Sequence, residues 1–455
     1  MSNNHSTFTL FQRLPLAMLV SLAFASTSQA QSLVDMYDMA KGYDAGYQSA
    51  KSQYEANLAK ADQGKAALLP TVGLGAGATR SNFEAHAING SSFTAQDRSY
   101  TTQTAGINAT QPLYRPANLA TYQQSQKGLD AARATLLQAE QDLIVRTSQA
   151  YFDVLGAQDS LTFVKAQKSA VAEQLASAKR NFDVGTATIT DTREAQARFD
   201  LVTAQQIAAE NDLNVKTVAL ELLVGKTGMT PSVLTTSAVL PQAPGAGPQE
   251  WIAQSEQIHP GIQQAKANLE IAKLETEKAE AGHKPTVDFT LGYNVQKNIN
   301  GAATVFASSQ NQATVTSAGV SLNVPIFAGF ATQNRVRETL ALEDKARNDL
   351  EGAQRQVAQA TRTAYLGLQS GLGQVKALEA AEASSQAALD ANKLGYQVGV
   401  RINIDVLNSQ SQLYQTKRDL AKARYDVLVG QLKLRQASGT LKAEDLQSIN
   451  ALLQK

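Results

Sequence analysis

Few side chains in this sequence have the type and spacing that catalysis or metal binding needs. The chain has no cysteine, which excludes disulfides, thiolate metal sites and cysteine nucleophiles. Beyond residue 30 its histidines, His86, His259 and His283, show no metal-ligand spacing. Residues 225–227 end like a phosphate-binding loop, but Leu220 stands where such a loop needs its first glycine. We therefore predict no catalytic site, no metal site and no cofactor, and a protein that is not an enzyme.

The polar residues that stand out belong to a segment that occurs twice. Residues 182–191 read Phe-Asp-Val-Gly-Thr-Ala-Thr-Ile-Thr-Asp, and residues 396–405 read Tyr-Gln-Val-Gly-Val-Arg-Ile-Asn-Ile-Asp. The same shift of 214 residues places 150–151 on 364–365, which are both Ala-Tyr. This period is far longer than that of a solenoid repeat, so it indicates a duplicated half-molecule. In each copy a Val-Gly pair predicts that a long helix ends and the chain reverses.

A very long helix is predicted before each of these turns. No proline occurs between Pro116 and Pro231, and residues 117–182 are mostly helix formers. A continuous helix over 117–182 would measure about 100 Å at about 1.5 Å per residue. Its apolar residues recur every seven positions, which is coiled-coil patterning: Leu136, Leu143, Ala150, Ala157, Val164, Val171 and Ala178. Glycines at 367, 371 and 373 leave the continuity of the second long helix open, since each costs about 1 kcal/mol against alanine.

Each half also contains two segments with strand periodicity, the clearest being 287–295, where apolar and polar residues alternate. Its partner is 320–326, and the first half repeats the pair at 72–78 and 107–113. Polar loops are expected at about 80–102 and 298–314. Such alternation also suits a half-buried sheet of a soluble protein, but these lengths fit a tilted membrane strand of about 9–11 residues.

Four strands cannot stand alone in lipid, because an open edge leaves backbone groups without hydrogen bonds. Copies of the chain must therefore share one barrel. Two copies would give eight strands, whose side chains fill the interior, whereas three give twelve strands that can leave a lumen. We predict a trimer.

The bulk composition excludes some functions and indicates export. A formal net charge of +1 with 18% charged residues gives no electrostatic surface for nucleic acid. Residues 1–30 resemble a secretory signal, with Arg13 before the apolar stretch 14–25 and a small-residue cleavage site ending at Ala30. That apolar stretch is too short to span a bilayer. The sequence thus predicts an exported protein.

Several motifs, in this order and with the duplication, make the chain resemble the TolC-type outer-membrane channels. The residues that carry the resemblance are 69–71, 150–152, 180–185, 189–191, 282–286, 395–401 and 404–407. The resemblance implies an α+β membrane protein in the outer membrane of a Gram-negative bacterium. A trimeric α-barrel of long coiled-coil helices crosses the periplasm and joins a 12-stranded β-barrel, to which each chain contributes four strands.

The resemblance also implies a division of the chain. Residues 1–30 are the signal, 31–227 the first structural repeat and 263–440 the second. Residues 228–262 are an equatorial linker, and 441–455 a C-terminal equatorial segment. In the family, these two segments form a belt around the tunnel.

The turns at the end of the long helices correspond to the periplasmic tips that dock an adaptor protein in this family. The matching residues are Val184, Gly185, Thr186, Val398, Gly399 and Val400. Polar links between helix pairs hold the family's tips shut, and the matching residues are Thr190, Asp191, Tyr396 and Arg401. The constriction aspartate of the family matches Asp405. Asn408 stands where a second aspartate is expected, which halves the charge of the ring.

The resulting expectation is a passive exit duct. Its partners would be a periplasmic adaptor, an inner-membrane ABC or proton-driven transporter, and outer-membrane lipid. Type I protein secretion and multidrug efflux both stay open. The alternative from another class is a periplasmic coiled-coil structural or adhesion protein.

Overall fold

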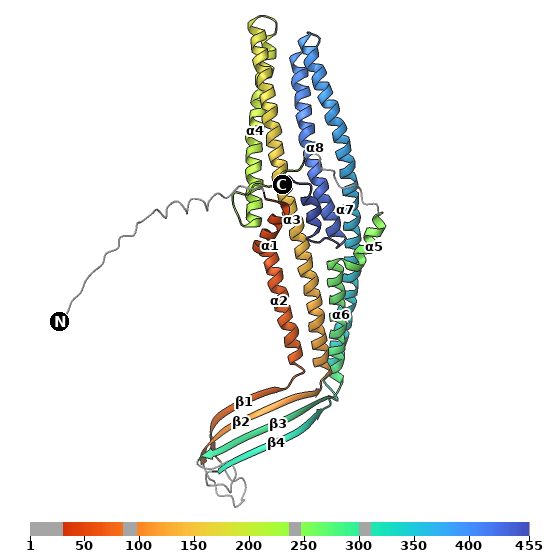
Figure 1. Ribbon diagram of the computed structural model, residues 1–455. Coiled ribbons are helices and arrows are strands. Elements are labelled where there is room, and N and C mark those ends of the chain that lie inside the picture. Colours follow the sequence, from red (N-terminus) through yellow and green to blue (C-terminus); the bar gives the residue numbers. More distant parts are fainter. Residues whose placement is uncertain (1–30, 85–97, 236–246, 300–310, 455) are drawn as a thin grey trace, which may run out of the picture.

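The computed structural model describes residues 31–84, 98–235, 247–299 and 311–454. The predicted signal over 1–30 lies outside them. Figure 1 shows an elongated molecule with a four-stranded sheet at one end and two helical hairpins side by side at the other. In the described part of the chain, no helix combines the length and the apolar character needed to cross a bilayer.

The sheet is an antiparallel meander in the order β1-β2-β3-β4, so the pairing of β2 with β3 joins the two halves of the chain. Its strands are β1 (Thr71–Phe83), β2 (Arg98–Tyr114), β3 (Thr286–Ile299) and β4 (Asn311–Asn323). The outer edges of β1 and β4 carry no neighbouring strand among the described residues.

The two faces of the sheet differ in polarity, as the alternating sequence predicts. Leu74 lies opposite Ile107, which in turn lies opposite Tyr293, and all three side chains are exposed. The next row, on the other face, contains Asn108 and Gly292. Successive strand residues point to opposite faces. One face is therefore apolar and suited to lipid, and the other is polar or glycine-rich.

The strands depart from the prediction at their ends. They extend into the expected loops, because polar side chains continue to pair across strands there: Thr102 Oγ1 donates to Asn298 Oδ1 at 3.0 Å, and Asn298 Nδ2 to Asn311 Oδ1 at 2.7 Å. The centres of both loops, 85–97 and 300–310, lie outside the described residues. At its other end β4 stops at Asn323, not at residue 326 as predicted, because Pro325 lacks the N–H that a strand ladder uses.

Both long helices are continuous. α3 (Pro116–Asp183) has 68 residues and α7 (Ala331–Gln397) has 67. The sequence left the continuity of the second helix open, but its glycines are helical. A Cβ added at Gly371 would lie 3.2 Å from the side chain of Val427 in α8 (Asn403–Ala437). Glycine there lets the two helices approach closely. The heptad prediction for α3 is confirmed at its tip half, where Val164, Val171 and Ala178 are buried.

Four helices stand side by side in the order α4, α3, α8, α7 (Figure 1). α4 (Ile189–Val224) folds back on α3, and α8 folds back on α7, so each half contributes one hairpin. The contact between α3 and α8 holds the hairpins together. α4 and α7 are therefore the outer helices of this layer.

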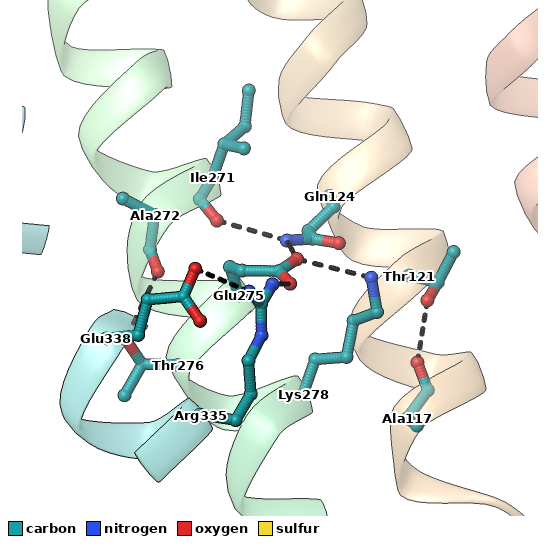
Figure 2. Close-up of polar contacts among 10 residues, drawn as sticks. All are labelled: Ala117, Thr121, Gln124, Ile271, Ala272, Glu275, Thr276, Lys278, Arg335 and Glu338. Atoms are coloured by element: carbon teal, nitrogen blue, oxygen red, sulfur yellow. Dashed lines mark hydrogen bonds and ion pairs between the residues drawn. The ribbon is translucent and has the colours of Figure 1, made fainter. Parts of the chain in front are cut away.

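Nearer the sheet, α2 (Ala45–Ala66) and α6 (Pro260–Glu280) pack against α3, and α6 also packs against α7. Figure 2 shows a polar network that ties three of these helices together. The Glu275 carboxylate of α6 accepts hydrogen bonds from Gln124 of α3 at 2.8 Å and from Arg335 of α7 at 2.6 Å. Lys278 adds a contact of 3.2 Å on the same helix.

The start, middle and end of the chain meet halfway along the helices, and we name residues 31–37, 230–235 and 446–454 the equatorial region. Gln31 forms an isolated parallel β-bridge with Pro231, and Leu234 forms an antiparallel one with Leu453. Tyr151 of α3 donates from its hydroxyl to the Ser232 carbonyl at 2.8 Å. α1 (Leu33–Tyr43) and α9 (Asp445–Asn450) pack into the same apolar core.

The segment predicted as a linker over 228–262 is not structureless. It contains α5 (Pro248–Ile258) and the first residues of α6, while 236–246 lie outside the described residues. Pro248 and Pro260 occupy the first positions of these two helices. Proline is favoured there because its missing N–H has no partner in the first turn.

Gly439, which ends α8, provides a test of this packing. It has φ +76°, and a Cβ there would lie 2.6 Å from the Cα of His259. We expect Gly439→Ala to lower the midpoint of thermal unfolding in detergent, followed by circular dichroism. Gly228→Ala is the control, since Gly228 has φ +73° but no atom within 4 Å of the added Cβ. The control should lose only about 1 kcal/mol of folding free energy, because alanine is strained at this positive φ. Equal losses in both variants would contradict the close approach to His259.

Candidate functional site: the tips of the helical hairpins

The two hairpins end in turns of the same geometry, at residues 184–186 and 398–400, which we name the tip turns. The glycines at their centres have φ +76° and +78°, a conformation that glycine adopts without strain. In each turn the residue after the glycine donates its N–H to a carbonyl five residues earlier, at 2.8 Å for Thr186 and 2.9 Å for Val400. The duplicated Val-Gly sequence therefore ends both helices in the same way.

The valines of the tip turns are unusually open to solvent. Val184 is 73% exposed, Val398 66% and Val400 78%. Each tip turn thus offers apolar surface at the far end of the molecule (Figure 1).

Asp191 in the first hairpin makes its hydrogen bonds within its own helix start. Its carboxylate accepts the N–H of Thr188 at 2.9 Å, and its N–H donates to the Thr188 hydroxyl oxygen at 3.2 Å. This reciprocal capping box satisfies two backbone groups at the start of α4. Thr190, one residue earlier, is exposed, and within the described residues its side chain makes no hydrogen bond.

Asp405 occupies the equivalent position in the second hairpin but does not cap its helix. The residue before α8 is Ile402, which has no side-chain oxygen to complete a capping box. The Asp405 carboxylate instead lies 3.7 Å from the guanidinium of Arg401, which stands in the turn just before α8, and both side chains are partly exposed. The carboxylate of Asp405 is therefore not used to cap its helix, and its contact is the ion pair with Arg401.

Polar contacts join the two hairpins near the tips. Tyr396 accepts at its hydroxyl from Asn181 Nδ2 of α3 at 3.3 Å. Asn403, at the start of α8, is fully buried and bonds to both helices of the other hairpin. Its Oδ1 accepts from Gln174 of α3, and its Nδ2 donates to the Asp191 carbonyl at 3.3 Å.

Asn408 lies one helical turn beyond Asp405 and also contacts the other hairpin. Its Oδ1 accepts from Arg198 Nη2 of α4 at 2.8 Å. Asn408 therefore serves as a neutral acceptor between α4 and α8.

These positions show which predicted residues the fold brings together. Tyr396, Arg401, Asp405 and Asn408 lie within three turns of one tip, whereas Arg401 does not reach Thr190 or Asp191 within one chain. Sequence reasoning missed Gln174, Arg198 and Asn403. The repeat contained one signal that could have identified Asn403: this polar residue stands at the position that the apolar Ile189 holds in the first half.

The tips therefore present hydrogen bonds, an ion pair and apolar surface rather than reactive groups. Across the described ranges, no three His, Asp or Glu side chains come together as a metal site would require. Such an arrangement can hold helices together and set a local field.

Comparison with known proteins identifies the fold and its class. A family model described as outer membrane efflux protein matches residues 37–226 and again residues 251–440. These two matches cover most of the chain and correspond to its two repeats. The chain belongs to the outer membrane efflux protein family.

Individual relatives agree with this assignment. The chain is 32% identical over 440 residues to outer membrane protein TolC of Vibrio cholerae, which covers 96% of this chain and 98% of that protein. It is 27% identical to the proteases secretion protein PrtF of Dickeya chrysanthemi, over 96% of this chain and 94% of that protein. The solved structure of the outer membrane protein VceC from Vibrio cholerae superimposes with a TM-score of 0.74 at 20% identity, over 90% of this chain and 96% of that one.

The predicted fold class and location are thereby confirmed: the chain has the fold of the TolC-type channels and is an outer-membrane exit duct of the secretion and efflux class. Family and fold are those of channels, not of enzymes.

The buried Asn403 provides a test of the contact between hairpins. Asn403→Ala removes two hydrogen bonds per chain, each contributing about 0.5–1.5 kcal/mol. We expect the tips to separate more readily, which should raise the single-channel conductance in planar bilayers. Asn392→Ala is the control, because Asn392 bonds to Ser409 within one hairpin and should leave the conductance unchanged. Equal conductance for Asn403→Ala and the wild type would show that these bonds do not restrain the tips.

Proposed function

We propose that three copies of this chain form a passive duct that receives its substrates at the tips and releases them outside the cell. A periplasmic adaptor and an inner-membrane transporter deliver the substrates. The observation that carries the proposal is a pair of exposed heptad seams on α4 and α7, the two outer helices of the layer.

The seam on α4 contains the larger side chains. Its members are spaced alternately by four and three residues and are all exposed: Ala197, Leu201, Ala204, Ala208, Asn211, Val215, Val218 and Leu222. Apolar residues at this spacing form the contact stripe of a coiled coil. The single Asn211 in the stripe would fix the register with a partner helix, as a polar residue does at such a position.

The seam on α7 contains mostly small side chains. It follows the same spacing over the last turns of the helix, and all its members are exposed: Leu366, Ser370, Gly373, Ala377, Ala380, Ser384, Ala387, Ala391 and Leu394. Both seams cover the half of the molecule nearest the tips. Small residues on one helix leave room for the larger residues of the other, so α4 of one copy fits against α7 of the next.

The sheet also needs a neighbouring copy, in its case at its two outer edges. β1 and β4 are the outer strands, and unpaired backbone groups cannot face lipid. Pairing β4 of one copy with β1 of the next closes the sheet. Three copies give twelve strands and a ring of helices around a common axis, which is a duct.

The tips form the entrance in this proposal. The exposed valines of the tip turns, Val184, Val398 and Val400, with Gly185, Thr186 and Gly399 between them, supply the surface that an adaptor contacts. Arg401 of one chain reaches Thr190 and Asp191 of its neighbour. Together with Tyr396 these links hold the entrance shut, while Asp405 lines the constriction beside Asn408.

The relatives' names indicate the kind of transport. They include proteins named for protease secretion and for outer-membrane efflux, so type I secretion and efflux both suit a passive duct without an enzyme activity. A periplasmic coiled-coil adhesion protein fits less well, because it gives no use to a sheet with an exposed apolar face.

The seams can be tested by placing a charge in one of them. Val215 is 56% exposed in the single chain, so Val215→Asp should leave the chain folded. We expect it to prevent trimer formation, since the carboxylate would be buried between chains without a partner. Sedimentation in detergent should show monomers. Asn214→Asp adds the same charge at an exposed neighbouring position outside the seam and should remain trimeric. Trimers of Val215→Asp would place the subunit contact elsewhere.

The ion pair beside the constriction leads to a second test. The Arg401 guanidinium neutralises part of the Asp405 charge at 3.7 Å. We expect Arg401→Ser to raise the conductance and the preference for cations over anions. Asp405→Asn should instead lower the preference for cations, and Tyr396→Phe should act on conductance alone. Reversal potentials in a salt gradient measure these preferences. Unchanged potentials in both charge variants would remove Asp405 from the constriction.

A further inference from the structure

A groove of about 390 Å³ lies between α4 and α8, beginning one helical turn beyond Asp405. It has an unusual lining for this protein, whose surface mixes both signs of charge. Two arginines line it, and none of the described residues around it is acidic. The polar residues that matter for the argument are Arg198, Arg418, Gln167, Asn408, Ser411 and Gln415.

Neutral oxygens are the hydrogen-bond acceptors of Arg418. Its Nη2 donates to Gln415 Oε1 at 2.6 Å, and its Nη1 to Gln167 Oε1 at 3.4 Å. Gln167 is itself buried and donates to the Ser411 hydroxyl at 3.5 Å. Asp419, the next residue of α8, accepts instead from Gln415 at 2.8 Å. Partial burial lowers the pKa of the Arg418 guanidinium, which still remains charged at neutral pH.

Arg198 is held in the same way by Asn408, at 2.8 Å. In the described part of the chain neither Arg198 nor Arg418 has a carboxylate within ion-pair distance. Other arginines of α8 differ: Arg424 pairs with Glu379 at 2.8 Å, and Arg435 pairs with Asp445. The Asp419 charge acts on Arg418 from beyond ion-pair distance. The groove thus keeps two positive charges that are not paired with a carboxylate and whose orientation is fixed by amides.

A guanidinium offers five N–H donors in a planar fork that matches oxyanions, and the amide contacts use only part of this set. We propose that this groove binds oxyanionic groups, namely carboxylate, sulfate or phosphate. Because the groove is partly open to solvent, the bound group can leave again, as transport requires.

The position of the groove gives it a role in the duct. The equatorial residues Val233 and Leu234 lie on one face of the α3–α8 contact, where they line a pocket with Phe163 of α3 and Leu420 of α8. The groove uses the other face of α8. Folded segments inside the tunnel would obstruct it, so the equatorial region lies outside and the groove faces the lumen. This placement rests on the proposed function, whereas the binding itself rests only on the groove.

Three copies then place six guanidinium groups around the lumen just beyond the Asp405 ring. A ring of positive charge directly after a negative constriction would bind anionic parts of a substrate that has passed the entrance. It would also lower the preference of the pore for cations.

Binding can be measured without a conducting pore. Inorganic tripolyphosphate is titrated by calorimetry into the full-length protein in detergent. We expect one site per chain in the wild type and about tenfold weaker binding in Arg418→Gln and in Arg198→Gln, because each removes a charge-assisted contact. Arg418→Lys should bind better than Arg418→Gln. The control is Arg424→Gln, which removes the same charge from the opposite face of α8 and should bind like the wild type. No binding to the wild type, or equal loss in the control, would overturn the proposal.

Block of the pore tests the location. Tripolyphosphate added on the tip side of planar bilayers should reduce the wild-type current and affect Arg418→Gln about tenfold less. Block by hexaglutamate as well would identify carboxylates of a passing chain as ligands, and block by tripolyphosphate alone would identify small inorganic anions. Binding in the calorimeter without block would overturn the lumen position. Absence of any pore would contradict the duct itself and leave the calorimetric result standing.

Discussion

The structure depends on hydrogen-bonding and apolar groups at the edges of the chain that no single copy can satisfy. β1 and β4 end the sheet with open backbone groups, and α4 and α7 end the helical layer with exposed heptad seams. An open strand edge is costly in lipid, and an exposed apolar seam is costly in water. Both ends of the molecule are therefore stabilised by the same event, the closure of a ring of copies. The rest of the fold holds these edges at a fixed distance from one another.

Within the ring, contacts inside a hairpin differ in kind from contacts between hairpins. Val171 and Val202 are buried between α3 and α4, and Leu389 and Leu413 between α7 and α8. Between hairpins the contacts near the tips include polar ones, and Leu407 and Ile404 of α8 add apolar contacts. A hydrogen bond can be exchanged for water at a net cost of about 1 kcal/mol, whereas exposing a buried leucine costs about 2–3 kcal/mol. This difference supports an entrance that opens by moving whole hairpins.

The duplication places two equivalent aspartates in different local settings. Thr188 engages Asp191 in a capping box, whereas Ile402 stands at the corresponding place before Asp405. The first repeat thus uses its carboxylate to begin a helix, and the second leaves it beside Arg401. The difference at a single capping position, Thr188 against Ile402, decides whether the aspartate caps its helix.

The sequence by itself determined the duplication, the first long helix, the membrane strands and the tip turns, because periodicity and the Val-Gly turn are local properties. It did not predict the helices that begin at Pro248 and Pro260, and it misjudged the strand ends, where cross-strand pairs extend the ladder. The polar partners at the tips were decided only by the tertiary structure. Asn403 meets Gln174, and Arg198 meets Asn408, across more than two hundred residues. Such contacts depend on how α8 packs against the hairpin formed by α3 and α4, which no local pattern encodes.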